Sequence, residues 1–242
     1  MTTQNSRILN ISVREGRMFV DRILLTCGLP AGYVQGVRDS VLFSQSLGLG
    51  GFQALVDGHS SLRMTAFDNI KINEDDGSTL SIDCAGMHAW LLAPTLTDLA
   101  VDIVRKKGSV TLKISNVRAV AEVSVIMELS KRYGARANVS LLPVDTLQQA
   151  AVMTFINASR PRTVDQADPL LSAALYDGYA VDESLWRSVY ALSNSALAPD
   201  SVVSRRHAGP VILQDDGTLL GRAPSDDDFD VNMLRKVIAQ PN

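Results

Sequence analysis

Residues 94–142 read PTLTDLAVDIVRKKGSVTLKISNVRAVAEVSVIMELSKRYGARANVSLL, and this stretch decides the fold. Apolar residues at helical spacing predict helices over 94–107 and 120–133, each ended by a glycine. Alternating apolar residues predict strands over 110–114 and 139–142. Helices and strands that alternate with short connections are typical of parallel crossover units, so the sequence predicts an α/β fold.

The N-terminal part of the chain carries helical signals. Ser12 and Glu15 have the Ser-x-x-Glu form of a capping box, which predicts a helix that ends at Gly28. A second helix is predicted over residues 31–47, because its valines recur at helical spacing. Glycines follow at once in residues 46–52, and they break this second helix.

These signals predict a helical N-terminal region, residues 1–60, packed on a crossover sheet core, residues 61–242, as one compact domain. The glycines of residues 46–52 follow a helix instead of a strand, and they lack the Gly-x-Gly-x-x-Gly spacing of a dinucleotide-binding loop.

Shorter elements are predicted in the rest of the chain. The turn Glu74-Asp75-Asp76-Gly77 predicts a β-hairpin, because Asp-Gly tolerates positive φ. Further strands are predicted over 62–66, 70–72, 80–82, 152–156 and 211–213, and further helices over 168–176 and 182–196. Loops are predicted over 86–90 and 160–162. The helix over 94–107 is predicted to begin at Pro94.

Composition excludes several classes of function. The chain has 242 residues, of which 46% are hydrophobic and 5% aromatic, and its formal net charge is −3. This charge gives no field that would hold a nucleic acid, and few aromatic residues are present for base stacking. Charged residues interrupt every apolar run before the length that spans a bilayer, and no signal segment is present. We therefore expect a cytoplasmic protein that acts on neither nucleic acid nor membrane.

The segment around Arg205 and Arg206 is the strongest candidate for chemistry. Two arginines and a histidine beside a glycine can form a fork for a carboxylate or phosphate. The alternative is a basic loop that pairs with the acidic residues at 215–216 or 226–230. The predicted ligand-binding residues are Arg118, Ser204, Arg205, Arg206, His207 and Gly209.

Other candidate sites have less support. Cys84 and His88 could supply two metal ligands or a thiol with its base, but no second pair lies nearby in the sequence. The acidic run of 226–230 lacks the alternation and the glycine of a calcium loop. No Gly-x-Ser-x-Gly elbow is present. The sequence therefore predicts no metal site and no serine hydrolase.

Motifs near both ends of the chain are shared with one family. They comprise Ser12, Glu15, Gly28-Leu29-Pro30, Gly51-Phe52-Gln53-Ala54-Leu55, Pro199, Ser204-Arg205, Ala208-Gly209 and Asp215-Asp216. This order resembles a bacterial family of unknown function over most of the chain. His207 and Pro210 depart from that family's Gly-Ala-Gly stretch. The resemblance conveys no activity.

A second resemblance begins at the Gly-Leu-Pro turn between the first two helices. It continues from Ile82-Asp83 through Lys107-Gly108 and Ser115-Asn116 to Tyr133-Gly134. The order of these motifs resembles that of the type 2 malate and L-lactate dehydrogenases. The resemblance implies a fold other than the Rossmann fold and hydride transfer assisted by two histidines. Gly50-Gly51 and Val117-Arg118 stand where those histidines are expected. The resemblance thus implies a scaffold whose original chemistry is gone.

The preferred hypothesis is the binding of a small anionic metabolite by Arg205, Arg206 and Arg118, in a diverged enzyme-like scaffold, a homodimer or an accessory subunit of an enzyme. The alternative is an oxidoreductase that uses NAD(P) on a small 2-hydroxy or 2-imino acid, with His88 or His207 as acid or base. A third hypothesis is a purely structural interaction protein.

Overall fold

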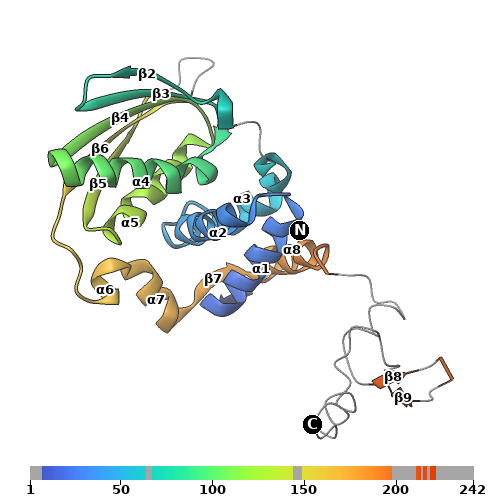
Figure 1. The fold of residues 1–242 in the computed structure, drawn as a ribbon. Coiled ribbons are helices and arrows are strands. Elements are labelled where there is room, and N and C mark those ends of the chain that lie inside the picture. The colour runs from blue at the N-terminus through green and yellow to red at the C-terminus, as the bar shows by residue number, and fades with distance from the viewer. Residues whose placement is uncertain are drawn as a thin grey trace, which may run out of the picture. The chain divides into compact units, whose positions relative to one another are not determined.

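The computed structural model describes residues 7–63, 67–143, 149–197, 211–213, 215–216 and 219–221. The chain divides into two compact units, Met1–Ala196 and Leu197–Asn242. The first unit contains a five-stranded sheet with the strand order β2-β3-β4-β6-β5 (Figure 1). Its strands are β2 (Lys71–Asp75), β3 (Thr79–His88), β4 (Ser109–Arg118), β5 (Ala135–Leu141) and β6 (Ala151–Asn157).

Crossover connections build this sheet, as the sequence predicts. Strands β3 and β4 are parallel and are joined by helix α4 (Ala89–Lys107). The 3-10 helix η3 (Val120–Val125) and α5 (Ile126–Lys131) lead from β4 to β5. Strand β6 pairs antiparallel with both β4 and β5 and thereby separates them. The α/β prediction is confirmed, with a mixed sheet whose two crossover helices share one face (Figure 1).

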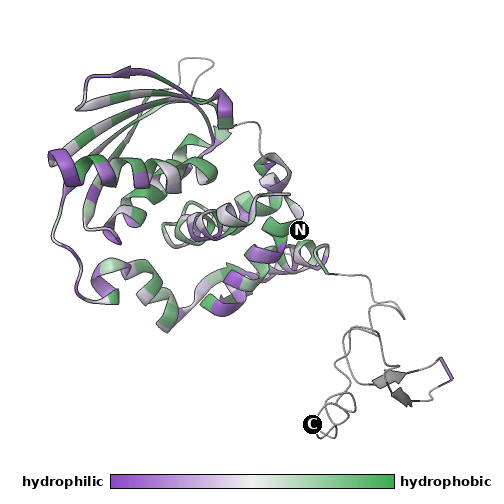
Figure 2. Ribbon diagram, viewed as in Figure 1, coloured by the Kyte–Doolittle hydropathy of each residue, from purple (hydrophilic) through white to green (hydrophobic). Residues whose placement is uncertain are grey.

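Alternation of side chains explains how the sheet is buried. Val110, Leu112 and Ile114 of β4 are nearly inaccessible, while the residues between them are more exposed. Figure 2 shows hydrophobic residues along much of α4 and hydrophilic residues at its C-terminal end. The core therefore lies between the sheet and its helices.

Helices from the N-terminal sequence form a second layer. They are α1 (Val13–Thr26), α2 (Ala31–Ser46) and α3 (Gly51–Gly58), followed by the 3-10 helices η1 (His59–Leu62) and η2 (Phe67–Asn69). The capping box is present: the Ser12 hydroxyl accepts from the Glu15 N–H at 3.2 Å, and a Glu15 carboxylate oxygen accepts from the Ser12 N–H at 3.2 Å. Helix α2 packs on α4, where Gly36 faces the ring of Pro94.

The end of the first unit returns to these helices. It contains α6 (Val164–Ala167), α7 (Pro169–Asp177), β7 (Tyr179–Asp182) and α8 (Glu183–Asn194). Strand β7 pairs antiparallel with β1 (Ile8–Ile11). Trp186 of α8 packs edge-on against Phe19 of α1 and Phe52 of α3. Both ends of the first unit thus contribute to its helical layer.

Three local predictions are wrong. Leu62 ends a 3-10 helix instead of beginning a strand. The predicted loop over 86–90 is instead the end of β3 and the start of α4, and Pro94 lies inside that helix. The helix begins earlier because the His88 side chain accepts from the Trp90 N–H and caps it. Residues 120–125 also form a 3-10 helix before α5.

The second unit is described over one hairpin, β8 (Val211–Leu213) paired antiparallel with β9 (Leu219–Gly221). The strand predicted over 211–213 is confirmed. The acidic run over 226–230 lies outside the described residues. No helix in the described part of the chain has the length and apolar character needed to cross a membrane.

Candidate functional site

The predicted ligand-binding residues are only partly placed. Arg118 is the last residue of β4, is exposed, and lies beside His88 in the parallel register of β3 and β4. Ser204, Arg205, Arg206, His207 and Gly209 lie outside the described residues. A shared site formed by Arg118 and this loop therefore stays a prediction.

His88 is held in a structural role. Its side chain is 7% exposed, its Nδ1 accepts from the Trp90 N–H at 3.2 Å, and its ring centroid lies 4.7 Å from that of Trp90. Burial, together with the nearby Arg118 guanidinium, lowers the pKa of His88 to about 4. The imidazole is therefore neutral at physiological pH, and one of its nitrogens is used as a helix cap.

Cys84 is inaccessible to solvent, and its thiol donates to the Ile82 carbonyl oxygen at 4.0 Å instead of pairing with His88. Burial and the neighbouring Asp83 raise the pKa of Cys84 to about 12. A thiol in this state is not a nucleophile at neutral pH. Within the described ranges, no group of three or more His, Cys, Asp or Glu side chains could hold a metal ion.

A cleft of about 380 Å³ opens where α5 ends, β5 begins and β6 ends. We call it the arginine cleft. Its lining residues are Lys131, Gly134, Ala135, Arg136, Ala158, Ser159, Arg160, Pro161 and Gln166.

The charge of the arginine cleft is positive. Lys131 is neutralised by Glu128, whose two oxygens lie 2.7 and 2.8 Å from its Nζ. Arg136 and Arg160 are exposed, and neither forms an ion pair with any residue that the structure describes. No carboxylate is among the lining residues. Two guanidinium groups therefore face solvent at the cleft without a counter-ion from the described chain.

Backbone contacts hold the two sides of the cleft together. The Ala158 N–H donates to the Gly134 carbonyl at 2.9 Å. Gly134 has φ +73°, and a Cβ added there would lie 3.2 Å from the Cα of Arg160. A glycine thus permits the close approach that brings Arg160 beside β5. Gln166 accepts from the Arg162 N–H at 3.0 Å through Oε1, which leaves its amide N–H₂ group free to donate.

An ion-pair network fixes the elements around the cleft. Arg132, next to Lys131 in the sequence, bonds Asp39 of α2 at 2.7 Å and Asp168, the N-cap of α7, at 2.9 Å. Asp168 is 5% exposed, so this pair is shielded from water. The network fastens the end of α5 to α2 and to the segment that carries Gln166.

Sequence reasoning missed Arg136 and Arg160, because they are far apart in the chain and belong to no motif. Only the antiparallel pairing of β5 with β6, in which Ala135 lies opposite Asn157, brings them together. The sequence predicts an exposed Arg-Pro-Arg loop over 160–162, but it does not predict that Arg136 lies in the same cleft as Arg160.

Comparisons with known proteins identify the fold. No protein-family model matches the chain, and no curated protein sequence matches it. Solved structures do match. Malate dehydrogenase from Pyrococcus horikoshii OT3 superposes with a TM-score of 0.57 at 9% identity, over 78% of this chain and 96% of that one.

Two further structures agree. A dehydrogenase from Sinorhizobium meliloti has a TM-score of 0.57 at 11% identity, over 77% of this chain and 100% of that one. Sulfolactate dehydrogenase from Methanocaldococcus jannaschii has a TM-score of 0.55 at 7% identity, over 78% and 97%. At these identities the likeness establishes the fold alone. The chain therefore shares the fold of malate and sulfolactate dehydrogenases, as the second resemblance implied.

Proposed function

We propose that this protein binds a small anionic metabolite, a carboxylate or phosphate, in the arginine cleft. The observation that carries the proposal is the pair of unpaired guanidinium groups of Arg136 and Arg160 in a cleft without a carboxylate. A guanidinium offers parallel N–H donors that match the oxygens of a carboxylate or phosphate. Two such groups favour a ligand with two negative charges.

The remaining chemistry of the cleft supports the same class of ligand. The free amide N–H₂ group of Gln166 adds neutral donors. A cleft of about 380 Å³ is in the range of small-molecule sites. Because both arginines are exposed, the binding is expected to weaken as salt rises.

Calorimetric titration with succinate and with methyl phosphate tests the proposal, with uncharged succinamide as the control ligand. Arg160→Gln and Arg136→Gln are each expected to weaken binding about tenfold or more, the loss typical of a hydrogen bond to a charged group. Arg162→Gln is the matched control, because Arg162 is exposed, carries the same charge and does not line the cleft. Equal affinities of Arg160→Gln and Arg162→Gln would refute the site.

The loop of Ser204, Arg205, Arg206, His207 and Gly209 remains a second proposed anion site, and Arg118 remains a separate proposed ligand residue of the first unit. Arg205→Ala in the same titration separates the two sites. A loss with Arg205→Ala and none with Arg160→Gln would move the binding to this loop.

The alternative function is an oxidoreductase that uses NAD(P) on a small 2-hydroxy or 2-imino acid. The fold shared with dehydrogenases favours it. The burial of His88 opposes a role as proton donor at neutral pH. If the protein is an oxidoreductase, NADH or NADPH should quench the fluorescence of the half-buried Trp186. The protein should also oxidise either cofactor in the presence of 2-oxo acids. Absence of both effects removes this alternative.

A further inference from the structure

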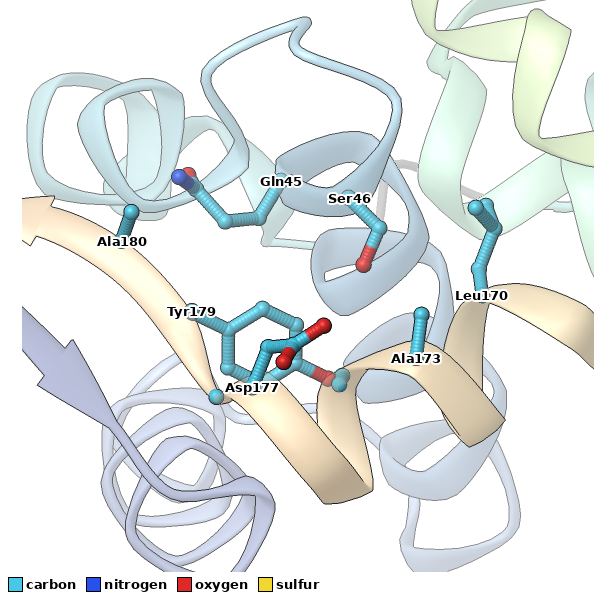
Figure 3. A pocket seen from close by; sticks show the side chains of 9 residues that line it. Gln45, Ser46, Leu170, Ala173, Asp177, Tyr179 and Ala180 are labelled. Atoms are coloured by element: carbon cyan, nitrogen blue, oxygen red, sulfur yellow. The ribbon is translucent and has the colours of Figure 1, made fainter.

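A second pocket, of about 270 Å³, lies between the C-terminal end of α2, helix α7 and strand β7. We call it the α2–α7 pocket. Figure 3 shows that its labelled side chains come from both sides of this space. Its lining residues are Gln45, Ser46, Leu170, Ala173, Ala174, Asp177, Gly178, Tyr179 and Ala180.

Polar groups line one part of the α2–α7 pocket. The Tyr179 side chain is buried, and burial raises the pKa of its phenol to about 12. The phenol therefore stays neutral. Gln45 accepts from the Phe52 N–H through Oε1 at 3.2 Å, so its amide N–H₂ group is available to a ligand.

Asp177 gives the pocket a negative charge. Its carboxylate has no ion pair or hydrogen bond with the residues that the structure describes, and no cationic residue lines the pocket. Asp177 is also the last residue of α7, whose final turn contains no basic residue. The partial negative charge at the end of the helix thus adds to that of the carboxylate.

Apolar side chains complete the pocket. Leu170, Ala173 and Ala174 line its α7 side. A complementary ligand therefore has a cationic group for Asp177 and a short hydrocarbon chain for this wall. We infer that the α2–α7 pocket binds a small primary ammonium compound, with the ammonium on Asp177 and its chain against Leu170 and Ala173.

Butylammonium is the probe, and 1-butanol, which has the same chain without the charge, is the matched control ligand. Titration is followed by ¹H–¹⁵N NMR at pH 7. Butylammonium is expected to shift the amide signals of Gly178 and Ala180. We expect 1-butanol to bind at least about tenfold more weakly than butylammonium. Equal binding of the two would show an apolar hollow only and would overturn the inference.

Variants test the site itself. Asp177→Asn is expected to weaken butylammonium binding about tenfold or more. Asp98→Asn is its control, because Asp98 is an exposed acid on α4. Ala173→Leu fills the pocket and should also abolish binding without a change of charge. Unchanged affinity in Asp177→Asn, or shifts that avoid Gly178 and Ala180, contradicts the proposed site. The arginine cleft does not enter this test, because none of its residues line the α2–α7 pocket.

Discussion

Lowering the pH from 7 to 4 is expected to destabilise the protein through His88. The folded protein holds this imidazole neutral, because burial and Arg118 lower its pKa from 6.5 to about 4. In the unfolded chain the same imidazole takes up a proton near pH 6.5. The unfolded state therefore binds more protons between these values, so the free energy of unfolding falls as the pH falls.

The size of this loss follows from the two pKa values of His88. At about 1.4 kcal/mol for each tenfold change in proton affinity, the gap between 6.5 and about 4 corresponds to about 3 kcal/mol. About 2 kcal/mol of it is lost by pH 5 and about 3 kcal/mol by pH 4, and the loss levels off about one pH unit below that. Protonation also removes the acceptor that binds the Trp90 N–H, so the cap of α4 is lost with it.

Urea unfolding of wild type and His88→Asn at several pH values measures the effect. Asparagine keeps a cap acceptor for the Trp90 N–H but does not titrate, and the titration of all other groups cancels in the difference. The stability of wild type relative to His88→Asn should fall by about 3 kcal/mol between pH 7 and pH 4. A flat difference over this range, or an NMR midpoint near 6.5 for His88, would refute the reasoning.

Other changes give further tests in urea unfolding. Arg132→Met should cost about 3 kcal/mol, because it leaves the carboxylate of Asp168 buried without its cation; the double variant with Asp168→Asn, which keeps the cap acceptor of α7 and removes the charge, is expected to recover most of this loss, and a purely additive loss contradicts it. Gly51→Ala should cost about 1–3 kcal/mol, since its Cβ would lie 2.2 Å from a backbone oxygen of α2, whereas Gly32→Ala, with open space around it, should not destabilise. Glu122→Ala should cost about 1–3 kcal/mol, because it removes the acceptor 2.8 Å from a buried indole N–H; a loss below about 0.5 kcal/mol would show that this bond is not important.

The sequence predicted those parts of the fold that depend on neighbouring residues. The capping box of Ser12 and Glu15, the hairpin turn of 74–77 and the two crossover units all involve short-range patterns, and the structure contains each of them. Prediction failed at the start of α4. Proline normally opens a helix, but here the cap at His88 and the packing of Pro94 against Gly36 place the proline inside it.

The candidate sites divide in the same way. Composition and spacing by themselves determined the α/β class and the positions of most helices. Only the tertiary structure decided that Arg136 and Arg160 share a cleft, because strand pairing brings together residues that no local pattern connects. It also decided that His88 is neutral, since the pKa of a side chain depends on its burial and on charges delivered by another strand.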